Sequence, residues 1–254
     1  MYEITVTRDV PYAVGAGGPD QHLDVFRPST GAPAPLVLLW HGVGPDEKDV
    51  MGTLAEQVAR RGQVVVVPDW RADAPDGGRA HLLASLASVR EHGAVWGGDP
   101  ERVVLAGWSA GAGAAVGVAL HPELVAGWRP AAVVAISGRY DVPARTTGRP
   151  PLDSLGTTRA HPVPVRLVHG RADALVPSRH SEEFAARLRE QDWDANLALL
   201  DTDHAGTIMT TYDAALGRPR PGGAPDVERA GHRTADLCAG AGQHPARVRP
   251  KRLV

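Results

Sequence analysis

The sequence predicts an α/β fold in which a mainly parallel, doubly wound sheet carries helices on both faces. Short, continuously apolar runs recur along the chain, and amphipathic helical patterns separate them. A strand buried on both faces gives a continuous apolar run, whereas a half-exposed strand alternates apolar and polar residues. Alternation of such runs with helices is the β-α-β pattern of a doubly wound sheet. The length of 254 residues fits one domain of this kind.

Each apolar run expected to form a parallel strand is followed, directly or after one proline, by Gly, His, Asp or Ser. These runs are 36–40, 64–67, 103–106, 132–136, 165–168 and 196–200. Two earlier segments, 3–7 and 23–26, are expected to enter the sheet antiparallel. Helices are expected where apolar residues recur at helical spacing, at 49–61, 81–92 and 178–190. Ligands of such sheets bind beyond the carboxyl ends of the strands, so the residues there are the first candidates for chemistry.

Composition narrows the class of protein. The formal net charge of −2 gives no sign of a nucleic-acid partner or of an anionic membrane. Cys238 is the single cysteine, so the fold cannot rely on an internal disulfide. Residues 1–10 lack the apolar core of a signal peptide, and no run approaches the roughly 18 apolar residues of a membrane span. A soluble cytoplasmic protein is expected.

The composition changes near residue 217. The segment 217–254 is rich in Gly, Pro, Arg and Ala, and it holds 8 Lys and Arg against 3 Asp and Glu. Few large apolar residues are available there to offset the entropy of ordering the chain. We therefore expect an α/β domain over 1–216, with a short cap loop at about 139–162, followed by a flexible tail over 217–254.

Ser109 is the candidate nucleophile. It lies in the run Gly107-Trp108-Ser109-Ala110-Gly111, after the strand expected at 103–106 and before a run of small residues. A serine at a tight turn from strand to helix adopts strained backbone geometry, and glycines on both sides let neighbouring chain pass. The N-terminus of the following helix then points toward a developing oxyanion.

A serine hydroxyl needs a base, and the base needs a carboxylate to orient it. His204 follows the run 196–200 and is the expected base. Asp173 follows the run 165–168 and is the expected acid, so that the order Ser109, Asp173, His204 is the one known for such sheets. Asp141, after the preceding strand, is the alternative acid. Four further histidines are expected to have structural or solvated roles: His41, His121, His161 and His169.

An acyl-transfer site also needs two donors for the oxyanion. The N–H group of Ala110, next after the nucleophile, is one candidate. Gly42 or Val43, in the loop after the strand at 36–40, is expected to supply the other. The Val43 side chain would add bulk beside the acyl group, which predicts a preference for small acyl groups.

Taken together, these segments resemble the α/β-hydrolase carboxylesterases, in particular the hormone-sensitive-lipase-like and feruloyl- or acetyl-esterase-like branches. The matching segments are 41–44, 68–71, 97–102, 107–111, 169–177 and 203–206. The resemblance implies an eight-stranded sheet, Ser109, Asp173 and His204 as the catalytic triad, and neither metal nor organic cofactor. Two residues depart from the pattern: Val43 interrupts the glycines of the oxyanion loop, and Trp108 stands where the family often has an acidic residue. The short segment 139–162 leaves no room for a large lipase lid.

The expected activity is hydrolysis of a small carboxylic ester through an acyl-enzyme. An amide or formamide hydrolase of the arylformamidase kind would use the same residues. A non-catalytic binding protein with this fold is the alternative outside enzymes. The sequence gives no indication of an oligomeric state or of partners beyond a small ester or amide substrate.

Overall fold

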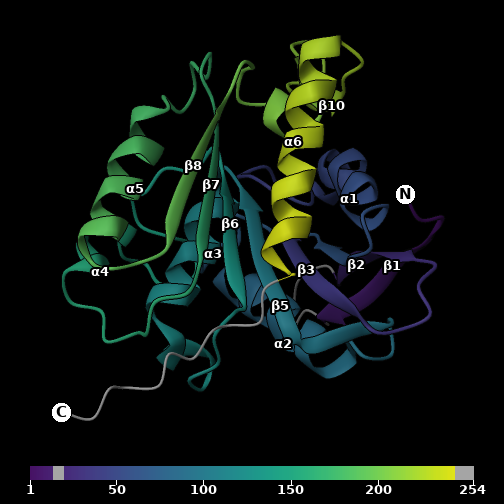
Figure 1. Ribbon diagram of the computed structural model, residues 1–254, viewed down its shortest axis with the longest axis horizontal. Helices are drawn as coiled ribbons and strands as arrows, with labels where there is room; N and C mark the ends of the chain where they lie inside the picture. The colour runs from purple at the N-terminus through teal and green to yellow at the C-terminus, as the bar shows by residue number, and fades with distance from the viewer. Residues whose placement is uncertain (14–19, 244–254) are drawn as a thin grey trace.

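The computed structural model describes residues 1–13 and 20–243 (Figure 1). An eight-stranded sheet runs in the order β1-β2-β4-β3-β5-β6-β7-β8, and β9 and β10 form a separate two-stranded ribbon. The strands are β1 Ile4–Ala13, β2 Gln21–Pro28, β3 Ala34–Trp40, β4 Val64–Pro68, β5 Gly98–Trp108, β6 Ala132–Ile136, β7 Val165–Gly170, β8 Ala195–Leu200, β9 Thr210–Asp213 and β10 Arg218–Pro221. From β4 to β8 neighbouring strands are parallel, and β1 and β2 join antiparallel. The eight-stranded, mainly parallel sheet is confirmed.

Helices cover both faces of this sheet. The helices are α1 Gly52–Ala59, α2 Arg79–His92, α3 Ala110–Leu120, α4 Pro151–Leu155, α5 Arg179–Glu190 and α6 Pro225–Ala241, with short 3₁₀ turns η1 Lys48–Met51, η2 Pro122–Val125 and η3 Gly206–Ile208. Apolar residues of α2, α3, α4 and α5 pack on one face, while α1 and α6 pack side by side on the other (Figure 1). The sheet therefore forms the middle layer of three.

Strand β3 shows why the central strands are continuously apolar. Leu36, Leu38 and Trp40 belong to the core under α2 and α3, whereas Val37 and Leu39 belong to the core under α1 and α6. Side chains of a strand point alternately to its two faces, so a strand buried on both sides needs an apolar residue at every position. The two cores hold the carboxyl ends of the strands in a fixed register.

The expectation of a flexible tail from residue 217 onward is wrong for the part of it that the structure describes. Residues 218–221 form β10, and α6 is a docked helix of the same domain. Its buried residues recur at helical spacing: Val227, Ala230, Gly231, Thr234, Ala235, Cys238, Ala239 and Ala241. Such small side chains contribute little to a hydrophobicity average, yet they let the helix lie close to the core. Residues 244–254 lie outside the described residues.

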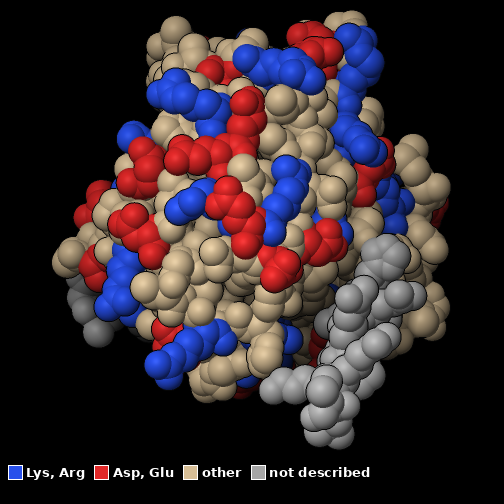
Figure 2. All heavy atoms as spheres, turned by 60° about the vertical axis from the view of Figure 1, so that its left-hand side comes forward, with Lys and Arg blue, Asp and Glu red and all other residues tan. Residues whose placement is uncertain are grey.

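The surface carries charges of both signs. On the face drawn in Figure 2, basic and acidic side chains of the described residues lie close together, without an extended region of either sign. Nucleic-acid-binding surfaces gather basic residues in one patch or stripe. The absence of a nucleic-acid partner stays a prediction. Within the described residues, no helix combines the length and apolarity needed to cross a membrane.

The docking of α6 gives a stability prediction. Ala235 is 0% exposed, so Ala235→Asp would bury an unpaired carboxylate and lower the free energy of unfolding by about 3 kcal/mol or more. Arg233→Asp introduces the same side chain on the exposed face of α6, and it should change that free energy by less than about 1 kcal/mol. Urea unfolding of both variants tests this. Equal effects of the two substitutions would mean that α6 is not docked.

Candidate active site

The residues expected to carry chemistry come together at one edge of the sheet. Ser109 follows β5, Asp173 follows β7 and His204 follows β8, while the loop that begins at His41 follows β3. These strands run parallel, so their carboxyl ends lie at the same edge. The sheet thus gathers four loops, distant in sequence, around one position.

Ser109 lies on the tight turn between β5 and α3. Its backbone has φ 55° and ψ −117°, a strained conformation for a non-glycine residue. A Cβ on Gly107 would lie 2.2 Å from the carbonyl oxygen of Gly111, and one on Gly111 would lie 2.5 Å from that of Trp40. Both flanking positions therefore require glycine for steric reasons. Ser109 is partly exposed, whereas residues 103–108 directly before it are buried.

His204 and Asp173 form a buried pair. Nδ1 of His204 lies 2.6 Å from Oδ2 of Asp173, and the two residues are 7% and 5% exposed. The other carboxylate oxygen, Oδ1, accepts the backbone N–H groups of Leu175 at 3.0 Å and Val176 at 2.8 Å. An ionised carboxylate has no proton to donate, so the Nδ1 atom carries the hydrogen and Nε2 is left free to accept a proton.

The charge of Asp173 is stabilised by these donors. Burial alone would raise the pKa of Asp173, but hydrogen bonds from His169, His204 and the Val176 N–H group together hold it well below its ordinary value. The carboxylate therefore stays ionised at neutral pH and orients the imidazole of His204. This is the arrangement in which a histidine can act as the base for a serine.

His169 is a second histidine that contacts the same carboxylate, and the sequence alone does not predict this contact. It is 0% exposed. Its Nε2 atom lies 2.7 Å from the carbonyl oxygen of Val176 and 3.2 Å from Oδ2 of Asp173, and its Nδ1 atom lies 2.7 Å from Oγ of Ser181. Both neighbours of Nε2 are acceptors, so Nε2 carries the hydrogen and Nδ1 accepts from the serine hydroxyl. The signal in the sequence for this contact is the spacing His-Gly-x-x-Asp at the end of the strand.

Asp141, the alternative acid, has other partners. Its carboxylate accepts hydrogen bonds from the guanidinium group of Arg139 at 2.8 and 3.0 Å, and it lies on the surface. Interaction with Arg139 lowers the pKa of Asp141. The structure thus brings Asp173, and not Asp141, to His204.

The loop after β3 lies against Ser109. A Cβ built on Gly42 would lie 3.5 Å from Cβ of Ser109 and 2.8 Å from a ring carbon of Trp108. Ala110 is the first residue of α3, where N–H groups have no partner within the helix. The Val43 side chain is 56% exposed. The assignment of Gly42, Val43 and Ala110 to an oxyanion hole stays a prediction that this proximity favours.

His41 holds that loop in place. It is 0% exposed, and its Nε2 atom accepts the backbone N–H groups of Trp70 at 3.1 Å and Glu47 at 3.4 Å. Its Nδ1 atom lies 3.0 Å from the carbonyl oxygen of Gly42. Burial lowers the pKa of His41 to about 3, so the imidazole is neutral and links the loop after β3 to the chain after β4.

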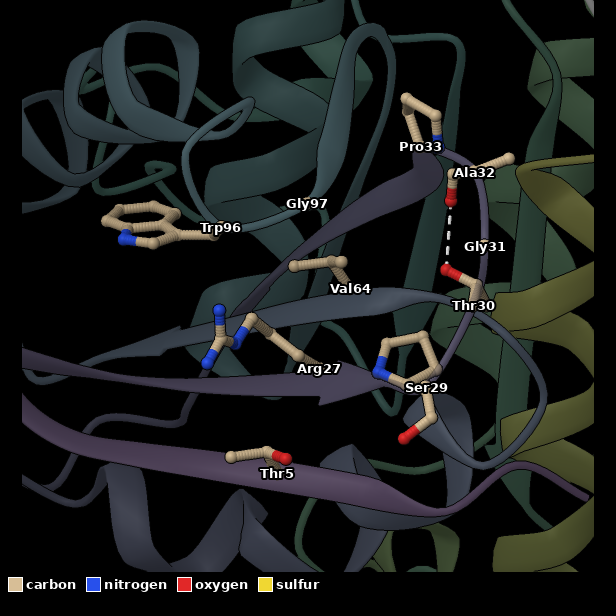
Figure 3. A pocket seen from close by; sticks show the side chains of 11 residues that line it. Thr5, Arg27, Ser29, Thr30, Gly31, Ala32, Pro33, Val64, Trp96 and Gly97 are labelled. Carbon is tan, nitrogen blue, oxygen red and sulfur yellow. Dashed lines mark hydrogen bonds between the residues drawn. The ribbon is translucent and has the colours of Figure 1, made fainter.

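A groove of about 430 Å³ lies elsewhere, at the opposite edge of the sheet (Figure 3). Its lining includes Thr5, Arg27, Val64, Trp96 and Gly97. Val64 begins β4 and Gly97 directly precedes β5, so the groove is at the amino ends of strands whose carboxyl ends carry the candidate site. It contains none of the residues expected to be catalytic.

The buried, neutral state of His41 predicts a specific pH dependence of stability. In the unfolded chain His41 takes up a proton near its ordinary pKa of about 6.5, whereas the folded protein binds it only near pH 3. Between these values the unfolded state binds more protons, so this stabilisation is full above about pH 6.5 and is lost as the pH falls, by at most about 1.4 kcal/mol per pH unit.

His41→Gln removes this titration. The variant should be less stable than the wild type at pH 7.5, and the difference in free energy of unfolding should shrink steadily toward pH 4.5. Urea unfolding across this range measures both proteins. Parallel stability curves for the two proteins would show that His41 is not buried in its neutral form.

Comparison with known proteins gives a family. A family model of the α/β-hydrolase fold matches residues 47–201. The esterase LipQ of Mycobacterium tuberculosis is 28% identical over an alignment of 228 positions, and the match covers 72% of this chain and 53% of that protein. The chain thus spans about half the length of this curated relative.

Solved structures share the fold. Esterase 2 of Thermogutta terrifontis phosphoramylated by tabun matches with a TM-score of 0.71 at 18% identity, and the match covers 93% of this chain and 92% of that chain. The same esterase with butyrate bound matches with a TM-score of 0.72 at 18% identity, and this match covers 97% of this chain and 96% of that chain. Because the family match takes in more than half of the sequence, this protein belongs to the α/β-hydrolase fold family.

Proposed function

We propose that this protein is a serine hydrolase that cleaves a small carboxylic ester through an acyl-enzyme. The observation that carries the proposal is the buried hydrogen bond of 2.6 Å between His204 and Asp173, at the sheet edge where Ser109 occupies a strained turn. The curated relative, an esterase, supports the same class of reaction.

The proposed steps follow from the chemistry of these groups. Nε2 of His204 takes the proton of Ser109 as its oxygen attacks the ester carbonyl, and the N–H group of Ala110, with that of Gly42 or Val43, stabilises the oxyanion. Each such donor contributes about 3–4 kcal/mol of barrier lowering in comparable sites. His204 then protonates the departing alcohol. The same imidazole then takes a proton from a water molecule as the water oxygen attacks the acyl carbonyl. His204 returns that proton to the serine oxygen as the acyl bond breaks, which releases the acid and the free serine.

The size of the acyl group is a separate proposal. The Thermogutta esterase with this fold binds butyrate, a short carboxylate. In this chain Val43 stands where the resembling family has a glycine in the oxyanion loop, and a valine side chain would add bulk to that loop. Both points support a substrate with a short acyl chain. Formamide or amide cleavage would use the same groups, and a panel of substrates separates the two reactions.

One prediction of the proposed function concerns activity and the role of Ser109. The wild type should hydrolyse p-nitrophenyl acetate faster than the octanoate, and both faster than an N-formyl arylamine. Ser109→Ala should lower kcat by at least about 10³-fold with an unchanged melting temperature, because the triad is lost without a change in packing. Initial rates and thermal melts measure these quantities. A wild-type protein that hydrolyses none of the esters would refute esterase function. Faster cleavage of the N-formyl arylamine than of any ester would instead indicate an amide hydrolase.

Another prediction of the proposed function separates the two candidate acids. Asp173→Asn keeps the shape of the side chain but removes its charge, and in a triad this change costs about 10⁴-fold in kcat. Asp141→Asn is the matched control and should change kcat less than about threefold, because Asp141 pairs with Arg139 at the surface. A large loss for Asp141→Asn together with a small one for Asp173→Asn would reverse the assignment.

A further inference from the structure

Trp108, the residue before the nucleophile, contacts both halves of the candidate site. It ends β5 and is 5% exposed. It stands where the resembling family often has an acidic residue, and the mechanism above gives it no role. Its indole reaches the loop that carries the base on one side and the loop after β3 on the other.

On the side of the base, the contacts are a hydrogen bond and a ring contact. The Nε1–H group of Trp108 donates to the carbonyl oxygen of His204 at 3.0 Å, and the two rings lie 4.9 Å apart between centroids, tilted by 43°. Oγ1 of Thr207 donates to the same carbonyl oxygen at 2.8 Å. With its carbonyl held by two donors and its Nδ1 atom held by Asp173, the position of the base is fixed at both ends.

On the side of the oxyanion loop, the contact is steric. A Cβ on Gly42 would lie 2.8 and 3.0 Å from two ring carbons of Trp108, whereas its distance of 3.5 Å to Cβ of Ser109 is ordinary contact. Gly42 does not have a positive φ, so its backbone would accept alanine. The indole is therefore what requires glycine at position 42, and it sets how closely the loop approaches the nucleophile.

We propose that Trp108 is a positioning residue that sets the spacing between the base His204 and the oxyanion loop at Gly42. Its ring also stabilises the imidazolium that forms when His204 takes the proton of Ser109, because a cation within about 6 Å of an indole is attracted to its π system. This stabilisation is absent while the imidazole is neutral, so it acts on the transition state rather than on substrate binding. The inference rests on the proposed function.

Two substitutions separate the ring from its N–H group. Trp108→Leu removes both and should lower kcat for p-nitrophenyl acetate by about 100-fold, while Trp108→Phe keeps an aromatic face and should lose only about 10-fold. KM should change less than about threefold in each, since the ground state is not stabilised. A purely structural role would lower the melting temperature without this division between kcat and KM.

A double-mutant cycle tests the contact with Gly42. In the wild type, Gly42→Ala should lower kcat/KM strongly. In the Trp108→Leu background the fold-loss caused by Gly42→Ala should be at least about 10 times smaller, because the ring that the new Cβ would meet is gone. Gly52→Ala is the matched control, since a Cβ there meets nothing within 4 Å, and its effect should be independent of Trp108. Independent effects of Gly42→Ala and Trp108→Leu would overturn the proposed spacing role.

The outcomes distinguish this inference from the proposed function. An inactive wild type would refute the function, and the inference with it. An active wild type whose Trp108→Phe and Trp108→Leu variants keep kcat would overturn the inference and leave the function standing. If Trp108→Leu fails to fold, Trp108→Phe alone still decides, because Phe fills most of the buried volume.

Discussion

The hydrogen bond between His204 and Asp173 is the interaction on which the site depends. It joins two loops that follow neighbouring parallel strands, β7 and β8. A carboxylate that is only 5% exposed is costly unless donors surround it. Here His204, His169 and two backbone N–H groups supply those donors, so the charge needed to orient the base is also compatible with a buried position.

Buried partners also hold the other loops at the carboxyl ends of the strands. His41 is buried as a neutral imidazole and fastens the loop after β3, while Trp108 lies between that loop and the base. None of these side chains could hold its position without the two apolar cores that fix the strands beneath them. A site of this kind needs its groups held to within about 0.5 Å, and packed interiors provide that rigidity.

The features of the fold that the sequence predicts correctly are those that depend on short stretches of neighbouring residues. Continuous apolar runs mark the strands, and the glycines around Ser109 mark its turn. Asp173 and His204 each follow such a run, which predicts that they meet at one edge of the sheet, and they lie in hydrogen-bond contact there. Helix α6 was missed because its buried face consists of Ala, Gly, Thr and Cys, which an average over 217–254 does not distinguish from a solvated segment. The contacts of Trp108 with His204 and Gly42 join loops far apart in sequence, so no local pattern indicates them. His169 contacts Asp173 within one short segment, but the spacing alone does not say which partner a buried histidine takes.

Covalent labelling of Ser109 tests the central claim most directly. The folded protein is treated with a fluorophosphonate, a reagent that reacts with activated serines, and its intact mass and peptides are measured. The account predicts a single adduct on Ser109, lost in Ser109→Ala and formed far more slowly in His204→Ala, because the base activates the hydroxyl. No adduct on folded wild-type protein, or an adduct at another residue with Ser109 unmodified, would contradict it.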